Sequence, residues 1–252
     1  SIRFDITDLP DRDAYRPTDL TSAAIQEAID NVIASGGGAV YLGSETYVCT
    51  STITLDPTRV SLIGRRAILD ASSGGQTDIL LVQTPDSGTQ YGHGTQVIEG
   101  IVIKGTGSGG TQRGITFYTP TNAVDHSSRI VVRNCSVYDV KYGHYYRQNA
   151  FCVKVFGGEV YGAEECVKTA NESNRGEAIC YYGVTLFNSY RGVFAEGASQ
   201  DLYFYGCSID YTTRWAYAAG CHIHWFGCHF EKNPPGNSDP PFEVDGGVML
   251  FV

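Results

Sequence analysis

A repeated pattern centred on a single Asn or Gly residue constrains the fold of this chain more than any other feature. Its five clear members are VVRNCSVY, KVFGGEVY, CYYGVTLF, LYFYGCSID and HWFGCHFE, centred on Asn134, Gly157, Gly183, Gly206 and Gly227. The steps between successive centres are short and uneven, and a weaker member, VIEGIVI around Gly100, lies one longer step upstream. Uneven repeats of this kind are typical of a solenoid whose coils tolerate inserted loops.

Apolar side chains alternate on both sides of each central residue. Around Gly206, Leu202 and Phe204 come before it, and Cys207 and Ile209 follow. Two strands therefore meet at a residue type that accepts a left-handed backbone, and the chain bends there while its apolar side stays inward. A second recurring patch, YGHYYR, EECVKT, RGVFAE and WAYAAG, predicts a third strand. Three short strands per coil, stacked about 4.8 Å apart, make an all-β fold, the parallel β-helix.

One helix is predicted, in the segment TSAAIQEAIDNVIASGGG near the N-terminus. Its apolar residues recur at helical spacing on one face, Thr21 is a suitable N-cap, and the glycines from Gly36 to Gly38 end it. The stretches that follow, AVYLG, YVCTSTITL, RVSLIG and DILLVQ, are of strand length and are separated by Gly, Ser, Asp and Pro.

The cap helix SAAIQEAIDNVIASGGGAVYLG, the following YVCTSTITL and the coils with Asn or Gly bends resemble the pectate-lyase-like right-handed, single-stranded parallel β-helix of bacteriophage tailspikes and capsule depolymerases. The resemblance extends from about Leu20 to Val252. It implies a homotrimer that binds and cleaves bacterial surface polysaccharide, most often as an endoglycosidase and sometimes as a lyase. It also implies a location on the virion or outside the cell, after folding in the cytoplasm. The repeat alone predicts only a solenoid.

Composition narrows the classes of function. The net charge of −9 speaks against nucleic acid as a partner, and no apolar run approaches the ~20 residues that span a bilayer.

We expect one domain over residues 1–252, with a lead-in at 1–19, the cap helix at 20–38 and coils at 39–252. The C-terminal GGVMLFV is a strand without a closing turn, so we expect further coils beyond it. The eight cysteines lack zinc-site spacing and are predicted to be free thiols.

Two acidic residues end the last two repeats at equivalent positions, Asp210 in FYGCSID and Glu231 in WFGCHFE. In-register stacking places these outward side chains on adjacent coils, with their carboxyl groups about 4 to 8 Å apart. Two carboxyl groups at such a distance repel, so one is expected to keep its proton, which supplies the acid and the base of glycosidic hydrolysis. The alternative is a solvated face whose acids pair with Lys232 and Arg214.

Other residues near this pair are candidates for the same site. Glu196 follows a strand at a turn and is a third catalytic candidate, and four residues are candidate substrate contacts: Arg214, His229, Tyr205 and Trp215. Glu243 and Asp245 follow a Pro-rich loop and are weaker candidates. Glu164 is expected to form an ion pair with Arg191 across two coils rather than to act in catalysis.

Aromatic residues immediately before four bends form a predicted outward ladder: Phe156, Tyr182, Tyr205 and Phe226, with Tyr203 and His224 beside them. Such a row either stacks on sugar rings or is buried in a subunit interface, and the resemblance to trimeric proteins favours the interface. Cys135, Cys207 and Cys228 point inward and are expected to pack in the core, since in-register parallel neighbours suit a disulfide poorly.

Several alternatives stay open on the sequence alone. No metal-ligand spacing, phosphate-binding loop or nucleophile elbow is present, so no metal or cofactor is predicted. A polysaccharide lyase is a second possibility, because Arg147, Lys168, Arg191 and Arg214 are spread over successive coils. A non-catalytic binding or structural β-helix is a third. The catalytic pair could also lie beyond Val252. The sequence does not identify the sugar, because specificity depends on the shapes of the candidate loops. These loops are Thr84 to Gln96, Thr119 to Ser128 and Asn233 to Pro241.

Overall fold

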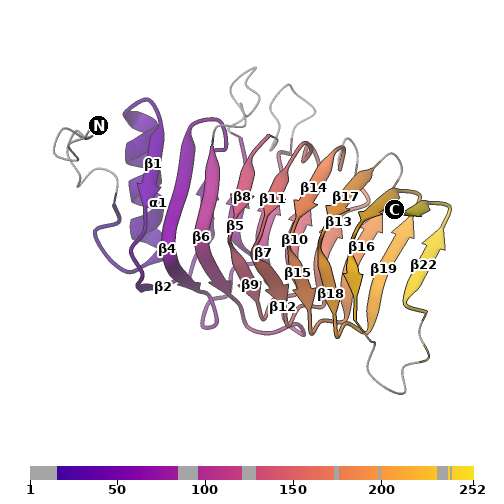
Figure 1. The fold of residues 1–252 in the computed structure, drawn as a ribbon. Coiled ribbons are helices and arrows are strands. Elements are labelled where there is room, and N and C mark those ends of the chain that lie inside the picture. The colour runs from indigo at the N-terminus through magenta and orange to yellow at the C-terminus, as the bar shows by residue number, and fades with distance from the viewer. Residues whose placement is uncertain are drawn as a thin grey trace, which may run out of the picture.

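The computed structural model describes residues 16–84, 96–120, 129–172, 176–197, 200–231, 238 and 240–252. The chain rises coil by coil from an N-terminal helix to the C-terminal strands, and the strands stack side by side along one axis (Figure 1). Every strand pair in the two sheets is parallel. This pairing establishes a parallel β-helix.

One sheet contains fifteen strands in two arms that meet at β6 (Val97–Lys104). The first arm contains β8 (Val131–Arg133), β11 (Lys154–Phe156), β14 (Ile179–Tyr182), β17 (Asp201–Tyr205), β20 (His222–Phe226) and β23 (Val248–Phe251). The second contains β9 (Ser136–Tyr138), β12 (Glu159–Tyr161), β15 (Thr185–Phe187), β18 (Ser208–Asp210) and β21 (His229–Phe230). Before β6 lie β1 (Gly38–Tyr41), β2 (Thr46–Val48) and β4 (Val60–Asp70).

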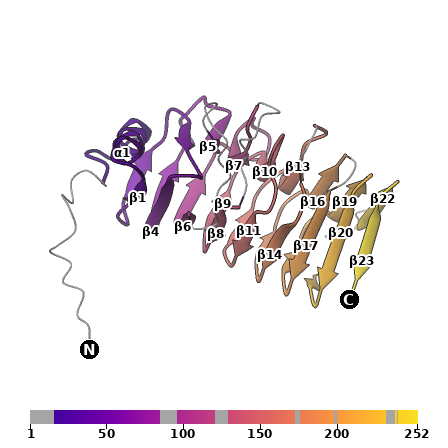
Figure 2. The same cartoon turned by 90° about the horizontal axis from the view of Figure 1, so that it is seen from above.

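The other sheet contains eight strands and faces the first across the core. Its members are β3 (Ile53–Leu55), β5 (Asp78–Val82), β7 (Arg113–Phe117), β10 (Tyr142–Tyr146), β13 (Glu165–Thr169), β16 (Arg191–Glu196), β19 (Arg214–Ala219) and β22 (Phe242–Asp245). From above, the successive coils are seen to follow one another in the order of the chain (Figure 2). The predicted count of three strands per coil is confirmed from β8 onward. Upstream, the stretch RVSLIG belongs to the longer strand β4, and YVCTSTITL divides into β2 and β3.

The predicted bends are confirmed at every repeat centre. Asn134 has a φ of 49°, and the five glycines of the other repeats have φ values between 57° and 66°. The amide of each later bend donates to the next coil, as from Gly206 to the Phe226 carbonyl at 2.9 Å. A left-handed residue between β17 and β18, and at the same place in neighbouring coils, therefore turns one arm of the sheet into the other.

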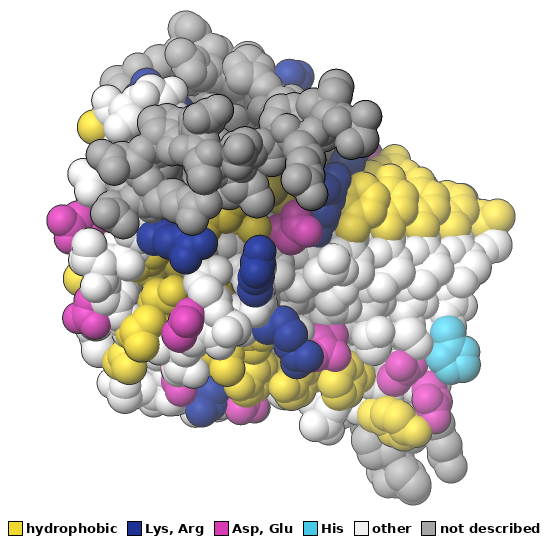
Figure 3. All heavy atoms as spheres, turned by 60° about the vertical axis from the view of Figure 1, so that its left-hand side comes forward, with side chains coloured by type: hydrophobic (Ala, Val, Ile, Leu, Met, Phe, Trp, Pro, Cys, Tyr) yellow, Lys and Arg dark blue, Asp and Glu magenta, His cyan; other side chains and the backbone are white. Residues whose placement is uncertain are grey.

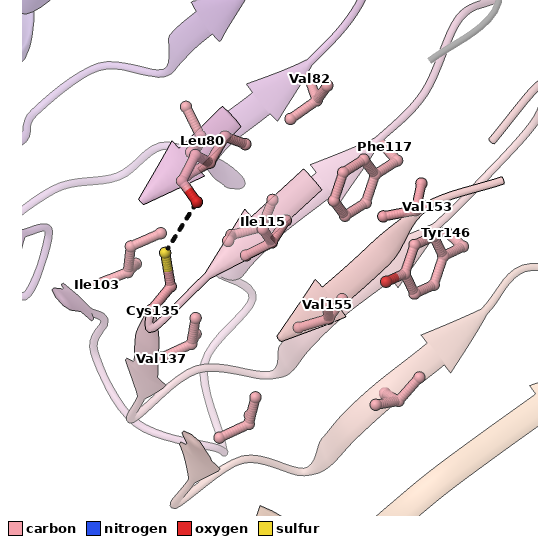
Figure 4. Close-up of a cluster of buried hydrophobic side chains, with 14 of the residues drawn as sticks. Leu80, Val82, Ile103, Ile115, Phe117, Cys135, Val137, Tyr146, Val153 and Val155 are labelled. Atoms are coloured by element: carbon pink, nitrogen blue, oxygen red, sulfur yellow. Dashed lines mark hydrogen bonds between the residues drawn. The ribbon is translucent and has the colours of Figure 1, made fainter. Parts of the chain in front are cut away.

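Residues on both sides of the bends fill the interior as the alternation predicts. Leu202, Phe204, Cys207 and Ile209 are each no more than 1% exposed. Side chains from both sheets meet in this core, as Ile115 of β7 and Val137 of β9 do in Figure 4. None of the eight cysteines forms a disulfide, and five of them are buried. The core is therefore held by apolar packing, with thiols among its members.

A short helix, α1 (Ser22–Ala34), covers the N-terminal end of the coils. The Thr21 hydroxyl accepts a hydrogen bond from the Ala24 amide at 3.2 Å, which confirms it as the N-cap. Ile25, Ile29 and Val32 are fully buried against the first coils. No helix in the described part of the chain is long and apolar enough to cross a bilayer. Together with the strand pairing, this helix confirms the predicted all-β parallel β-helix with a short N-terminal cap.

Candidate active site

The structure brings the two predicted carboxylates together on the outer face of the second arm. Asp210 ends β18, and Glu231 follows β21 on the next coil, where its amide donates to the Ile209 carbonyl at 3.0 Å. His229 stands opposite Ser208 in the same pairing. One carboxylate oxygen of each acid and a ring nitrogen of His229 all lie within 4.8 Å of one another. The in-register stacking of the coils therefore makes neighbours of side chains that are one whole repeat apart in the sequence.

Hydroxyl groups hold both carboxylates in place. The Ser208 hydroxyl lies 2.8 Å from each oxygen of Asp210, and the Tyr211 hydroxyl donates to Glu231. That hydrogen bond is the main reason why the pKa of Tyr211 is raised above its usual value. Tyr211 has a φ of 51° and is 55% exposed. Neither Ser208 nor Tyr211 was anticipated as a partner of the pair, although Ser208 lies at the outward position two residues before Asp210.

Trp215, a predicted substrate contact, supports the backbone of the site. Its indole nitrogen donates to the Glu231 carbonyl at 3.1 Å, and its ring packs against Phe230 and Phe242. The hydrogen bond joins β19 of the opposite sheet to the end of β21. Trp215 therefore helps to hold the Glu231 backbone in position.

An aromatic ladder leads to the carboxylates along the second arm. Tyr138, Tyr161 and Phe187 occupy the position of Asp210 in the three preceding coils, and their rings stack with centroids 5.0 and 4.8 Å apart. Because the ring faces cover one another, a ligand outside the ladder meets ring edges and the two tyrosine hydroxyls. The acids thus replace aromatic rings in the last two coils.

Glu196, the third catalytic candidate, lies in a different cluster on the outer face of the eight-stranded sheet. It ends β16, and its carboxylate pairs with Lys168 Nζ at 2.8 Å. Lys168 is also 3.6 Å from Glu165 and lies 3.4 Å from the centre of the Phe194 ring. The prediction that Glu196 stands beyond its strand was wrong, because pairing with β19 continues to this residue.

The expected ion pair between Glu164 and Arg191 was also wrong by one residue. In the observed register Arg191 lies opposite Glu165, and its guanidinium is 2.7 Å from that carboxylate, whereas Glu164 is 3.9 Å from Lys141. Glu165 is 3% exposed, and this burial raises its pKa despite the two cations beside it. Glu165 lies eight residues after the bend at Gly157, and Arg191 lies eight residues after the bend at Gly183, so counting from the bends gives the observed pairing.

The basic residues of this face are engaged with carboxylates. Arg147 lies 2.6 Å from Glu172, and Arg214 lies 2.8 Å from Glu243. Together with Lys168 and Arg191, all four residues on which the lyase alternative depends have an acidic partner. Arg214 thus meets Glu243 of the next coil, and it is not part of the group at Asp210. In Figure 3, which views the molecule with the N-terminal side forward, Lys and Arg side chains lie among acidic and apolar side chains.

Tyr205 belongs to a second ladder, on the first arm. Phe156, Tyr182, Tyr205 and Phe226 stack with centroids 4.7, 5.0 and 4.7 Å apart, as predicted. All four are half-buried. Tyr205 ends β17 before the bend at Gly206, whereas Asp210 lies after it. The bend therefore separates Tyr205 from the carboxylates.

Some predictions fall outside the described residues or beside the site. Lys232 and nearly all of the three candidate loops belong to the parts of the chain that are not described. Asp245 ends β22 and is exposed. Among the described residues, neither Asp210 nor Glu231 forms an ion pair with a lysine or an arginine, so the alternative pairing with Arg214 is not seen.

A second group of polar side chains was missed by the sequence analysis. Asp201, His222 and His224 place one ligand atom each within 4.8 Å of one another on β17 and β20. A search for short Cys and His spacings cannot find this group, because its members come from two coils. The signal was nevertheless present, since the step between the last two repeats aligns Asp201 with His222.

No protein-family model and no curated protein matches this chain. Among solved structures, the ORF18 protein of Geobacillus virus E2 is 15% identical, with a TM-score of 0.43 over 91% of this chain and 57% of that protein. The A-module of mannuronan C-5 epimerase AlgE4 from Azotobacter vinelandii is 10% identical, with a TM-score of 0.29 over 92% of this chain and 91% of the module. The chain thus spans about 57% of the length of the virus protein. Similarity at this level carries no functional argument.

Proposed function

We propose that the protein cleaves glycosidic bonds in bacterial surface polysaccharide, such as capsule, exopolysaccharide or O-antigen, with Asp210 and Glu231 as the two carboxyl groups. The observation that carries the proposal is the grouping of these acids with His229 within 4.8 Å on the outer face. The substrate class comes from the resemblance of the cap helix and coils to phage tailspikes. Both acids occupy a position that aromatic residues fill in earlier coils, so the scaffold does not require them.

The chemistry needs one proton donor and one ionised carboxylate. One group protonates the leaving oxygen while the other attacks the anomeric carbon, and water then hydrolyses the glycosyl intermediate and returns the proton. Retaining enzymes hold their carboxyl groups about 5–5.5 Å apart, against about 6.5–9.5 Å in inverting enzymes. Because one oxygen of Asp210 and one of Glu231 lie within 4.8 Å of each other, the scheme proposed here follows the retaining mechanism.

The neighbouring residues supply positioning rather than chemistry. Ser208 and Tyr211 hold the carboxylates by hydrogen bonds, and Trp215 holds the Glu231 backbone. His229 is exposed beside both acids and is the residue best placed to contact a bound sugar. Arg214 and Tyr205 have other partners, so their contribution to binding is indirect. Water is the only co-reactant that this scheme requires.

The lyase alternative requires cations that are free to neutralise a uronic acid. Arg147, Lys168, Arg191 and Arg214 are each held by a carboxylate, which makes them poor candidates for that task. Lyase products contain a double bond that absorbs in the near ultraviolet, so a spectrum of the products separates the two reactions. A non-catalytic binding protein gives no products at all.

The test of the proposal is a pair of isosteric variants, Asp210→Asn and Glu231→Gln. Each is expected to lower the rate of polysaccharide cleavage by about 10²–10⁴-fold, because a proton-transfer or nucleophilic group is lost without a change in shape. The rate of reducing-end release from capsule or O-antigen is the measurement. Glu159→Gln is the matched control, since Glu159 is an outward acid on the same arm, two coils away from Asp210.

Retained activity in both variants would overturn the assignment of the site, and equal loss in the Glu159 control would indicate a general effect on the arm. The anomeric configuration of the first product, followed by NMR, tests retention. An inverted product contradicts the nucleophilic role while leaving the two carboxylates in place as acid and base.

The assembly and location are proposed on the same resemblance. A homotrimer on a phage tail, or a secreted trimer, gives the ladder from Phe156 to Phe226 a role, because its exposed ring edges form a continuous apolar strip along the first arm. No role with nucleic acid or inside a membrane is proposed.

A further inference from the structure

We propose that Asp201, His222 and His224 form a binding site for a divalent transition-metal ion of the zinc type. The site lies on the outer face of β17 and β20, on the other side of the bend from the carboxylates. It does not depend on the proposed hydrolysis, and its members are not used in that mechanism.

The stacking of two coils assembles the three ligands. His222 and His224 are two residues apart on β20, so both point outward from the same face. Asp201 lies directly opposite His222 on the neighbouring strand, and Tyr203 lies opposite His224. One strand therefore supplies both imidazoles and the other supplies the carboxylate.

The distances fit a tetrahedral ion. The Asp201 Oδ1 atom is 3.0 Å from His222 Nδ1 and 3.8 Å from His224 Nε2, and the largest separation in the group is within 4.8 Å. Bonds of about 2.0–2.2 Å to nitrogen and oxygen in tetrahedral geometry place the ligand atoms about 3.3–3.5 Å apart. Small side-chain rotations suffice to reach that arrangement.

Neighbouring side chains hold the rings in this orientation. Tyr203 stacks on His224 with centroids 4.6 Å apart, and Phe226 lies parallel to it at 6.4 Å. His224 keeps 20% of its side chain exposed, whereas His222 keeps 52%. On the next coil Val248 and Leu250 lie opposite the two histidines and border the site with apolar surface. Because these contacts restrict the rings, the side chains lose less freedom when an ion binds.

The donor set selects the kind of ion. Two imidazoles and one carboxylate suit zinc and its neighbours, whereas calcium and magnesium prefer oxygen ligands. Three protein ligands leave one coordination position for water, as in open zinc sites. A bound ion also joins β17 to β20 and thereby stabilises the C-terminal coils by mass action.

Calorimetric titration of the purified chain with Zn²⁺, without an affinity tag that contains histidine, tests the proposal. We expect one equivalent to bind at this site. Each of His222→Ala, His224→Ala and Asp201→Asn is expected to weaken binding by about 100-fold or more, since loss of a ligand exceeds the 10–100-fold cost of losing an outer partner. Co²⁺ used in place of Zn²⁺ reports tetrahedral coordination by its visible absorption.

His229→Ala is the matched control, because it removes an exposed histidine from the group at Asp210 and should leave binding at Asp201 unchanged. Absence of binding overturns the proposal, as does binding that survives both histidine substitutions. Binding lost only in His229→Ala assigns the ion to the other group and also overturns it. Circular dichroism of each variant shows that the fold is retained.

Discussion

Glu165, in the eight-stranded sheet, is an acidic residue that is buried, whereas acidic residues are usually exposed. Glu165 is 3% exposed, yet it is flanked by Arg191 at 2.7 Å and Lys168 at 3.6 Å. The cost of removing its charge from water is the largest effect on it, and its pKa is raised above the ordinary value of 4.5 although both cations lower it. The two cations therefore offset only part of the rise in pKa that burial causes.

The raised pKa of Glu165 predicts an unusual dependence of stability on pH. The folded state binds this proton more tightly than the unfolded state does, so the contribution is fully present below 4.5 and is lost as the pH rises through the folded pKa. The stability of the wild type relative to Glu165→Gln should thus increase as the pH falls from neutral towards 4.5. Each tenfold difference in proton affinity between the two states contributes about 1.4 kcal/mol to that increase.

Urea unfolding of both proteins at several pH values in this window measures the difference. A difference that shrinks on acidification would show that the attraction of Arg191 and Lys168 outweighs burial. Glu159→Gln, at a half-buried acid, serves as the control for general effects of charge.

At the scale of the element, the bends decide where one strand ends and the next begins. Gly206 has a φ of 58°, and a Cβ atom there would meet nothing within 4 Å. Gly158 has a φ of 80°, and a Cβ atom there would lie 2.1 Å from the Cys135 carbonyl oxygen of the preceding coil. The first glycine is needed only for its backbone conformation, and the second also for the close stacking of coils.

Alanine at the two positions should therefore have different costs. Gly206→Ala is expected to destabilise the fold by about 1–2 kcal/mol, the cost of a left-handed conformation for a residue with a Cβ atom. Gly206→Asn should cost less, since Asn accepts this conformation and occupies the equivalent bend at Asn134. Gly158→Ala should cost more than Gly206→Ala, because the neighbouring coil must also move. Urea unfolding of the three variants supplies the order, and an equal cost at both glycines would contradict it.

At the scale of the whole molecule, the coils form a one-dimensional stack in which each coil contacts mainly its neighbours. Such a molecule presents long straight surfaces, and its two arms carry different ones. The first arm has the ladder through Tyr182, and the second has the ladder through Tyr138 that leads to the carboxylates. The proposed trimer uses the first arm and leaves the second open to polysaccharide.

A charge placed on either ladder tests this division. Tyr182→Asp should convert the trimer to a monomer, because a carboxylate buried in an apolar interface has no partner. Tyr138→Asp, the matched change on the other arm, should leave the trimer intact. Light scattering coupled to size-exclusion chromatography measures the mass of each. A monomeric wild type, or a trimer that survives Tyr182→Asp, contradicts the proposed interface.

The sequence by itself determined the repeat, the bends and the inward and outward positions. These features are local, because a residue such as Gly206 and the alternation around it require no knowledge of distant contacts. It also determined that Asp210 and Glu231 are neighbours, since the step from the bend at Gly206 to the bend at Gly227 becomes one strand spacing once the coils stack in register.

Only the tertiary structure decided what each side chain meets. It placed Glu196 against Lys168, and it joined the Trp215 indole to the Glu231 carbonyl by a hydrogen bond. It also assembled Asp201 with two histidines of the next coil. The physical reason is that the register between strands fixes which backbone positions are neighbours. Hydrogen bonds and ion pairs depend in addition on the directions of the side chains, which the repeat does not specify.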